Sequence, residues 1–115
     1  MKTKIKTKTH NPDVHYVVMN LIEKNPDITQ RELAKKTGIS LGSVHYCLKA
    51  LAHKGWIKAK KFTNNPNKSS YLYLLTPQGL IQKSDLAVDF LRRKRVEYES
   101  LRKEIDELTE ELKDD

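Results

Sequence analysis

The sequence predicts an α+β fold in which three short helices and a β-hairpin form one small domain, followed by a long helix. Three observations support this prediction. Helix-starting signals recur along the first half of the chain, two short β-type runs flank a polar segment, and an apolar heptad runs through residues 91–112. We expect a disordered basic arm over residues 1–10, the domain over residues 11–75 and the long helix over residues 76–115.

The first helix is predicted to begin at Asn11, a favourable N-cap, with Pro12 at the first helical position. The pair Asn25-Pro26 ends it, because a residue that precedes proline avoids the helical conformation. Between these limits, apolar residues recur at helical spacing and are expected to face the core: Val14, Val17, Val18, Leu21 and Ile22.

The second helix begins with a capping box, in which Thr29 and Glu32 each satisfy a backbone donor of the other. Leu33 and Ala34 are expected to point inward. Gly38 suits the left-handed position that ends a helix, so this helix is short.

A third helix is predicted to start at Ser40 and to end at Gly55. Only Gly38 and Ile39 separate it from the second helix, so the two helices must cross steeply, as in a helix-turn-helix. Its expected buried face consists of Leu41, Val44, Cys47, Leu48 and Leu51.

A β-hairpin is predicted after the third helix. Residues 56–62 and 70–75 form its strands, and residues 63–69 have the composition of a turn. Ile28 is a candidate for a short third strand. A three-helix core with such a hairpin, or wing, predicts a winged helix-turn-helix domain.

The last helix is predicted to start at Thr76-Pro77, an N-cap followed by proline, with Gly79 as a weak point early in the helix. Its heptad predicts a dimerisation helix, although the helix could instead fold back on its own domain. Lys94 interrupts the apolar seam. An antiparallel pair is favoured because it brings Arg92, Arg93 and Arg95 near the acidic end of the partner helix, and a parallel pair, with Glu97 beside Arg102, is the alternative. The expected interface residues are Leu91, Tyr98, Leu101, Ile105, Leu108 and Leu112.

The charge distribution favours a nucleic-acid partner. The formal net charge is +7, and residues 97–115 carry nine acidic and three basic residues, so the rest of the chain is +13. A single cysteine, Cys47, allows no internal disulfide and is expected in the core. No catalytic cluster, metal-ligand spacing, cofactor motif, signal peptide or membrane span is found, so we expect a cytoplasmic protein that is not an enzyme.

Double-stranded DNA is the expected partner. The third helix would present its outer face to the major groove, and the hairpin would contact the DNA backbone or the minor groove. The start of the second helix offers backbone N–H groups to a phosphate. The candidate DNA-binding residues are Gln30, Arg31, Ser40, Gly42, Ser43, His45, Tyr46, Lys49, Lys60, Lys61, Asn64, Asn65 and Lys68.

Residues 12–112 resemble MarR-type winged helix regulators. Closer similarity, to the MarR-type regulators associated with exopolysaccharide gene clusters, is carried by SLGSVHYCLKAL (40–51), KGW (54–56), YLYLLTPQG (71–79) and FLRRKRVEYESLRKEI (90–105). The resemblance implies a homodimer that binds a specific operator, with exopolysaccharide genes as its targets. Tyr46 stands where many members have arginine, so their base preference does not carry over.

The chain as given has no counterpart of the extra N-terminal helix with which larger MarR proteins build their dimer and effector pocket. The resemblance therefore leaves a small-molecule effector open. The sequence accordingly predicts a DNA-binding transcription regulator that acts as a homodimer on a palindromic operator. The alternative is a winged helix module that binds other proteins and no specific DNA.

Overall fold

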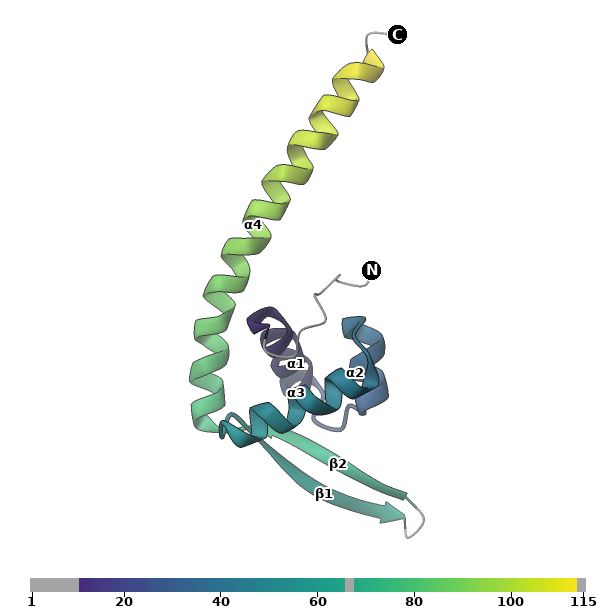
Figure 1. Ribbon diagram of the computed structural model, residues 1–115, viewed down its shortest axis with the longest axis vertical. Helices are drawn as coiled ribbons and strands as arrows, with labels where there is room; N and C mark the ends of the chain where they lie inside the picture. Colours follow the sequence, from purple (N-terminus) through teal and green to yellow (C-terminus); the bar gives the residue numbers. More distant parts are fainter. Residues whose placement is uncertain (1–10, 66–67, 114–115) are drawn as a thin grey trace.

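The computed structural model describes residues 11–65 and 68–113, and it describes residues 62–65 and 68–70 by their backbone only. The expected basic arm of residues 1–10 lies outside this range. The elements follow in the order α1 (Pro12–Lys24), α2 (Gln30–Thr37), α3 (Leu41–His53), β1 (Ile57–Asn65), β2 (Lys68–Leu75) and α4 (Pro77–Lys113). Figure 1 shows three helices packed together, a hairpin extending beside α3, and α4 reaching far beyond them.

The predicted helix caps are confirmed. The side chain of Asn11 accepts a hydrogen bond from the Asp13 backbone N–H, and the capping box of Thr29 and Glu32 is complete. Gly38 has a φ of 79°, the left-handed conformation expected after α2. The Ser40 side chain caps α3 by accepting from the Ser43 backbone N–H at 3.1 Å. These local signals fix where each helix begins and ends.

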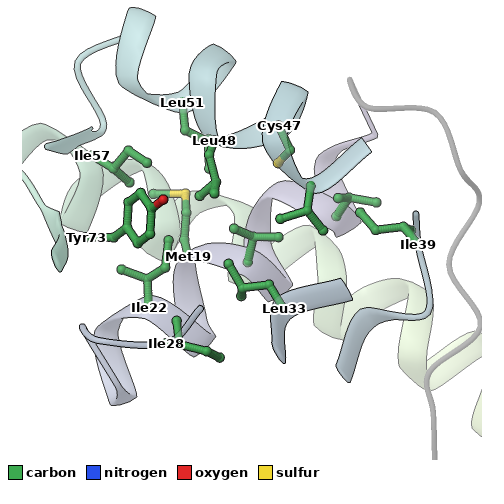
Figure 2. Packing of buried hydrophobic residues seen from close by; sticks show 13 residues of the cluster. Met19, Ile22, Ile28, Leu33, Ile39, Cys47, Leu48, Leu51, Ile57 and Tyr73 are labelled. Carbon is green, nitrogen blue, oxygen red and sulfur yellow. The ribbon is translucent and has the colours of Figure 1, made fainter. Parts of the chain in front are cut away.

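The core lies between α1, α2, α3 and the base of the hairpin (Figure 2). Most of the predicted apolar face of α3 is buried, but Leu41 is 45% exposed, so its assignment to the core is wrong. Leu41 is the first residue of the helix, where no neighbouring element covers it. Residues that the helix patterns did not include complete the core: Met19, Ile28, Ile39, Ile57 and Tyr73.

The hairpin is longer than predicted. β1 and β2 pair antiparallel, with Ile57 opposite Leu75 and Lys61 opposite Tyr71, and the pairing continues to Asn65 and Lys68. Most of the predicted turn of residues 63–69 is therefore strand. Asparagine and serine are weak strand formers, but a ladder already started by apolar residues can carry them.

A third strand at Ile28 is not formed, because the sheet of the described residues has two strands. One backbone hydrogen bond joins this region to the hairpin, from the Tyr73 N–H to the Pro26 carbonyl at 2.9 Å. Ile28 itself is a buried core residue. The segment before α2 therefore fixes the hairpin against the helices without extending the sheet.

The start of α4 is fastened to the turn that follows α3. Thr76 donates its hydroxyl to the Gly55 carbonyl and its backbone N–H to the Trp56 carbonyl, and its Oγ1 accepts from the Gly79 N–H. Gly79 is buried here. Gly79 is predicted as a weak point of the helix, and the structure adds that this position has no room for a side chain.

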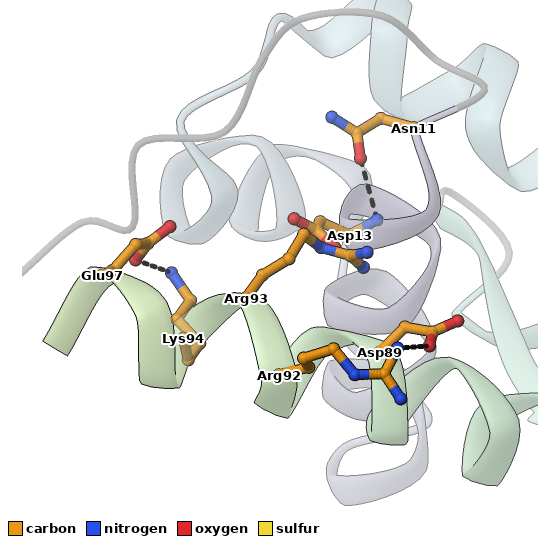
Figure 3. A network of polar contacts seen from close by, with 7 residues as sticks. All are labelled: Asn11, Asp13, Asp89, Arg92, Arg93, Lys94 and Glu97. Carbon is orange, nitrogen blue, oxygen red and sulfur yellow. Dashed lines mark hydrogen bonds and ion pairs between the residues drawn. The ribbon is translucent and has the colours of Figure 1, made fainter. Parts of the chain in front are cut away.

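The first half of α4 packs antiparallel along α1. Lys83 contacts Glu23, Phe90 lies against Tyr16 with ring centroids 4.8 Å apart, and Arg93 pairs with Asp13. Figure 3 shows Arg93 reaching across to Asp13, while Arg92 and Lys94 pair with acidic residues of α4 itself. Beyond Lys94, every described side chain of α4 is exposed.

Candidate nucleic-acid interface

The outer face of α3 presents most of the side chains expected to read bases. His45, Tyr46 and Lys49 are exposed, whereas Val44, Cys47 and Leu48 on the opposite side are buried. The burial of one face fixes the direction of the other, because successive residues of a helix rotate by about 100°. His45 and Lys49 lie one turn apart and form a polar row, and Tyr46 is 51% exposed beside them.

The first turn of α3 combines hydroxyl groups with an open surface. Ser43 is half-buried, and its hydroxyl accepts a hydrogen bond from the Ser40 hydroxyl at 2.9 Å, so both serines serve the helix cap. A β-carbon at Gly42 would meet no atom of the described residues within 4 Å. The fold therefore does not require glycine at this position, and the open space above it would admit a close partner.

The hairpin divides its lysines between two faces. Cross-strand partners in an antiparallel pair share a face, and alternate residues of one strand do as well. Lys61, opposite Tyr71, therefore lies on the face that carries Ala59 and Tyr73. Lys60, opposite Leu72, lies on the other face. Lys60 and Lys61 are both exposed, but only Lys61 shares the face turned toward α3.

A groove of about 200 Å³ separates α3 from the hairpin. Its floor is apolar, and the two tyrosine rings, Tyr71 and Tyr73, lie 6.3 Å apart along one wall. The Gln30 side chain donates to the Tyr73 hydroxyl at 3.2 Å. The groove is lined by Gln30, His45, Leu48, Lys49, Ala52, Ile57, Ala59, Tyr71 and Tyr73.

Two side chains at the start of α2, Gln30 and Glu32, already have partners within the chain. Gln30 points its amide at Tyr73. The Glu32 carboxylate accepts from the Thr29 backbone N–H and hydroxyl, so a negative charge already stands at this helix end. Arg31 is exposed and directed away from the core. The phosphate contacts expected of Gln30 and Arg31 stay predictions.

Three predicted site residues cannot be placed, and two residues that were not predicted belong to the groove. The side chains of Asn64, Asn65 and Lys68 lie outside the described part of the structure. Tyr71 and Tyr73, which the sequence-based list of site residues did not include, are part of the groove. Their alternation in a predicted strand could have revealed them, because residues two apart in a strand share a face.

Cys47 is fully buried beneath α3. Burial raises the pKa of its thiol to about 11, and the nearby positive charge of Lys54 opposes this shift only in part. The thiol is therefore a core group, as predicted from its position on the apolar face. Among the described residues, no three His, Cys, Asp or Glu side chains form a group able to hold a metal ion. None of the described helices has a stretch long and apolar enough for a bilayer.

Residues 13–58 match the sequence model of a family described as "Winged helix-turn-helix DNA-binding". They comprise α1, α2, α3 and the beginning of β1, with the hairpin in the position of the wing. The chain folds as a winged helix-turn-helix protein. A comparison with curated protein sequences gave no match.

Solved structures of transcription regulators share this winged helix fold. The PcaV transcriptional regulator from Streptomyces coelicolor, crystallised with its natural ligand, superposes with a TM-score of 0.62 and 22% identity, covering 71% of this chain and 57% of its own. The adhesin competence repressor AdcR from Streptococcus pyogenes has a TM-score of 0.61 and 21% identity, and the match covers 79% of this chain and 66% of AdcR.

FabT from Streptococcus pneumoniae, in complex with DNA, has a TM-score of 0.55 and 22% identity, with 87% of this winged helix chain and 74% of FabT covered. The chain thus spans 57% of the PcaV regulator and 66% of AdcR. At these identities the likeness shows the shared fold.

Proposed function

We propose that this winged helix protein is a sequence-specific DNA-binding transcription regulator that acts as a homodimer on a palindromic operator. The observation that carries the proposal is the side-by-side placement of the polar face of α3 and the basic hairpin across one groove. A helix face of His, Tyr and Lys can contact base edges, while hairpin lysines neutralise phosphates. The match of residues 13–58 to a DNA-binding family supports the same assignment.

The resemblance to MarR-type proteins supports a more specific proposal about the genes that are regulated. The fold is shared with FabT, which was crystallised in complex with DNA, and with a MarR protein from Staphylococcus aureus. We further propose that the protein is a MarR-type regulator of exopolysaccharide genes, because the motifs of residues 40–51 and 71–79 resemble those of such regulators. A DNA target places the protein in the cytoplasm, and the role requires neither catalysis nor a cofactor.

The decisive experiment is selection of bound sequences from a random DNA pool, with the full chain as the binder. We expect an enriched inverted repeat, because a symmetric dimer reads two half-sites. The selection is then repeated with Tyr46→Ala, which should relax one base position in each half-site at a cost of about 1–3 kcal/mol. Absence of any enriched motif, together with salt-independent binding, would favour a protein-binding module instead.

The homodimer is tested by sedimentation equilibrium of the full chain. The double variant Leu101→Gln with Leu108→Gln removes two seam side chains, and the control Lys103→Gln with Glu110→Gln changes two residues on the opposite face of α4. We expect a dimer for the chain and for the control, and a monomer for the seam variant. A wild-type monomer at micromolar concentration would refute the homodimer and leave DNA binding to be judged by the selection.

A further inference from the structure

An exposed apolar stripe runs along the whole of α4 on a side that the domain leaves uncovered. Lys83, Phe90 and Arg93 contact α1, and the stripe follows a different line of the helix. Its members are between 49% and 74% exposed, which is unusual for side chains of this size. They are Leu80, Ile81, Val88, Leu91, Tyr98, Leu101, Ile105, Leu108 and Leu112.

The seven-residue spacing of Leu91, Tyr98, Ile105 and Leu112 suits a partner helix wound in a coiled coil. The stretch from Leu91 to Leu112 is about 32 Å long at 1.5 Å per residue, enough for three heptads. Because α1 lies on another side of α4, a second helix can approach the stripe even beside the domain. The occupant must therefore be a helix with a matching seam.

Charged residues flank this seam with one sign on each side. Assigning Leu91 to position a places glutamates at every g position from Glu97 to Glu111, with Glu104 between them. The e positions of the same heptads carry Arg95, Arg102 and Thr109. Since side chains at g and e line the two borders of a coiled-coil interface, their signs determine which partner direction is favourable.

We propose that α4 pairs with α4 of a second copy in parallel and in register; this deepens the homodimer of the proposed function and rests on it. In a parallel pair, each g residue faces the following e residue of the partner. Glu97 of one copy then lies beside Arg102 of the other, and symmetry repeats this contact. Glu104 faces Thr109, so the flanking g and e positions bring no like charges together, although the two Lys94 side chains at a d position do face each other.

An antiparallel pair would bring like charges together. In that arrangement g faces g and e faces e, so glutamates would oppose glutamates and arginines would oppose arginines. Antiparallel pairing would also bring the basic run of residues 92–95 near the acidic end of the partner helix. Ion pairs within the chain weaken this attraction, because they already engage some of these basic side chains. Arg92 already pairs with Asp89, and Arg93 pairs with Asp13.

The position of the domain on α4 agrees with parallel pairing. Figure 1 shows the three helices and the hairpin gathered at the N-terminal end of α4, with the C-terminal half standing clear. Parallel pairing places both domains at the same end, related by a two-fold axis that runs along the helices. Both copies of α3 can then approach one DNA duplex, whereas antiparallel pairing sends the domains to opposite ends.

The test is disulfide cross-linking of full-length variants that each add one cysteine at a d position, Leu101→Cys or Leu108→Cys. In a parallel pair each position faces its own copy, so both variants should cross-link at least about tenfold faster than the outward-facing control Lys103→Cys. The wild-type chain is a second control, because Cys47 is fully buried. Sedimentation equilibrium under reducing conditions gives the oligomeric state of each variant.

The outcomes separate the two levels of the proposal. Fast self-cross-linking of both variants supports the parallel pair. A dimer in which only one position self-cross-links, or in which the mixed Leu101→Cys and Leu108→Cys pair links fastest, overturns the parallel arrangement but keeps the homodimer. A monomeric wild-type chain overturns both.

Discussion

Gly79 lies so close to Trp56 that a β-carbon at position 79 would stand 1.9 Å from the Trp56 carbonyl oxygen. The same carbonyl accepts a hydrogen bond from the Thr76 backbone N–H at 3.0 Å, so it cannot swing away without breaking that contact. This junction joins the turn after α3 to the first turn of α4. The direction of the long helix relative to the outer face of α3 therefore depends on a glycine.

We expect Gly79→Ala to destabilise the domain by about 1–3 kcal/mol, as is typical of overpacking against a rigid group. The neighbouring atoms are backbone, which cannot rotate aside as a flexible side chain would. Urea unfolding followed by circular dichroism measures the change. The matched control is Gly42→Ala, where the new methyl group meets nothing and should stabilise α3 by up to about 1 kcal/mol. Equal free energies of unfolding for Gly79→Ala and Gly42→Ala would contradict the close contact between Gly79 and Trp56.

Gly42→Ala also tests the proposal that this side of α3 faces DNA. Because no atom of the described residues lies close to this glycine, we expect the space above it to be occupied by DNA in the complex. The variant should then bind its selected operator at least about tenfold more weakly while its fold is as stable as the wild type or more so, since one misplaced group can cost more than 1 kcal/mol at a close-packed contact. Unchanged affinity in a quantitative gel-shift titration would show that DNA does not approach this turn closely.

The local parts of the fold follow from the sequence because their causes are local. Asn11, the Thr29 and Glu32 pair, and Ser40 each act within their own helix turn, so their roles could be predicted without the tertiary structure. The exposure of Leu41 could not be predicted in this way. Its apolar side chain fits the helix pattern, but none of the described elements covers the start of α3.

The candidate interface was less predictable for the same physical reason. The outward direction of His45 and Lys49 follows from the buried face of α3. The contact of Gln30 with Tyr73 joins residues 43 positions apart, and only the tertiary packing brings them together. Likewise, the separation of Lys60 and Lys61 onto opposite faces depends on the strand register, which composition does not reveal.

The two hairpin lysines should differ in their effect on DNA binding. Lys61 shares a face with Tyr71 beside the groove, so we expect Lys61→Ala to lower the slope of log K against log salt by about one unit. Lys60→Ala, on the opposite face, is the matched control and should change the slope less. Fluorescence anisotropy between low and physiological salt measures both. A larger loss for Lys60→Ala would place the DNA on the other face of the hairpin.

The thiol of Cys47 should be inert in the folded protein. Its pKa is raised to about 11 by burial, against an ordinary value of 9.0, so the thiolate fraction at pH 8 is about 100-fold smaller than in an unfolded chain. Alkylation by iodoacetamide at pH 8 should be slower by at least this factor, and urea should restore it.

The shift in the Cys47 pKa also has a consequence for stability. A raised pKa favours the protonated native state, so the contribution of this thiol is fully present below pH 9 and declines as pH rises toward 11. Comparing the pH dependence of unfolding for wild type and Cys47→Ala isolates this contribution. Rapid alkylation without denaturant would contradict the buried position.

Lys94 should weaken the pairing of α4 that the apolar stripe predicts. It occupies a d position of the heptad, between Leu91 and Tyr98, yet its ammonium turns aside to Glu97 and lies 5.2 Å from the ring centroid of Phe90. We expect Lys94→Leu to tighten the dimer at least about tenfold, because an apolar side chain at this position gains burial against the partner. Lys103→Leu, which adds the same side chain on the outward face, should leave the dimer unchanged. Analytical ultracentrifugation over a range of concentrations gives both dissociation constants. If the two variants tighten association equally, the gain comes from nonspecific hydrophobic association, and Lys94 does not lie in the seam.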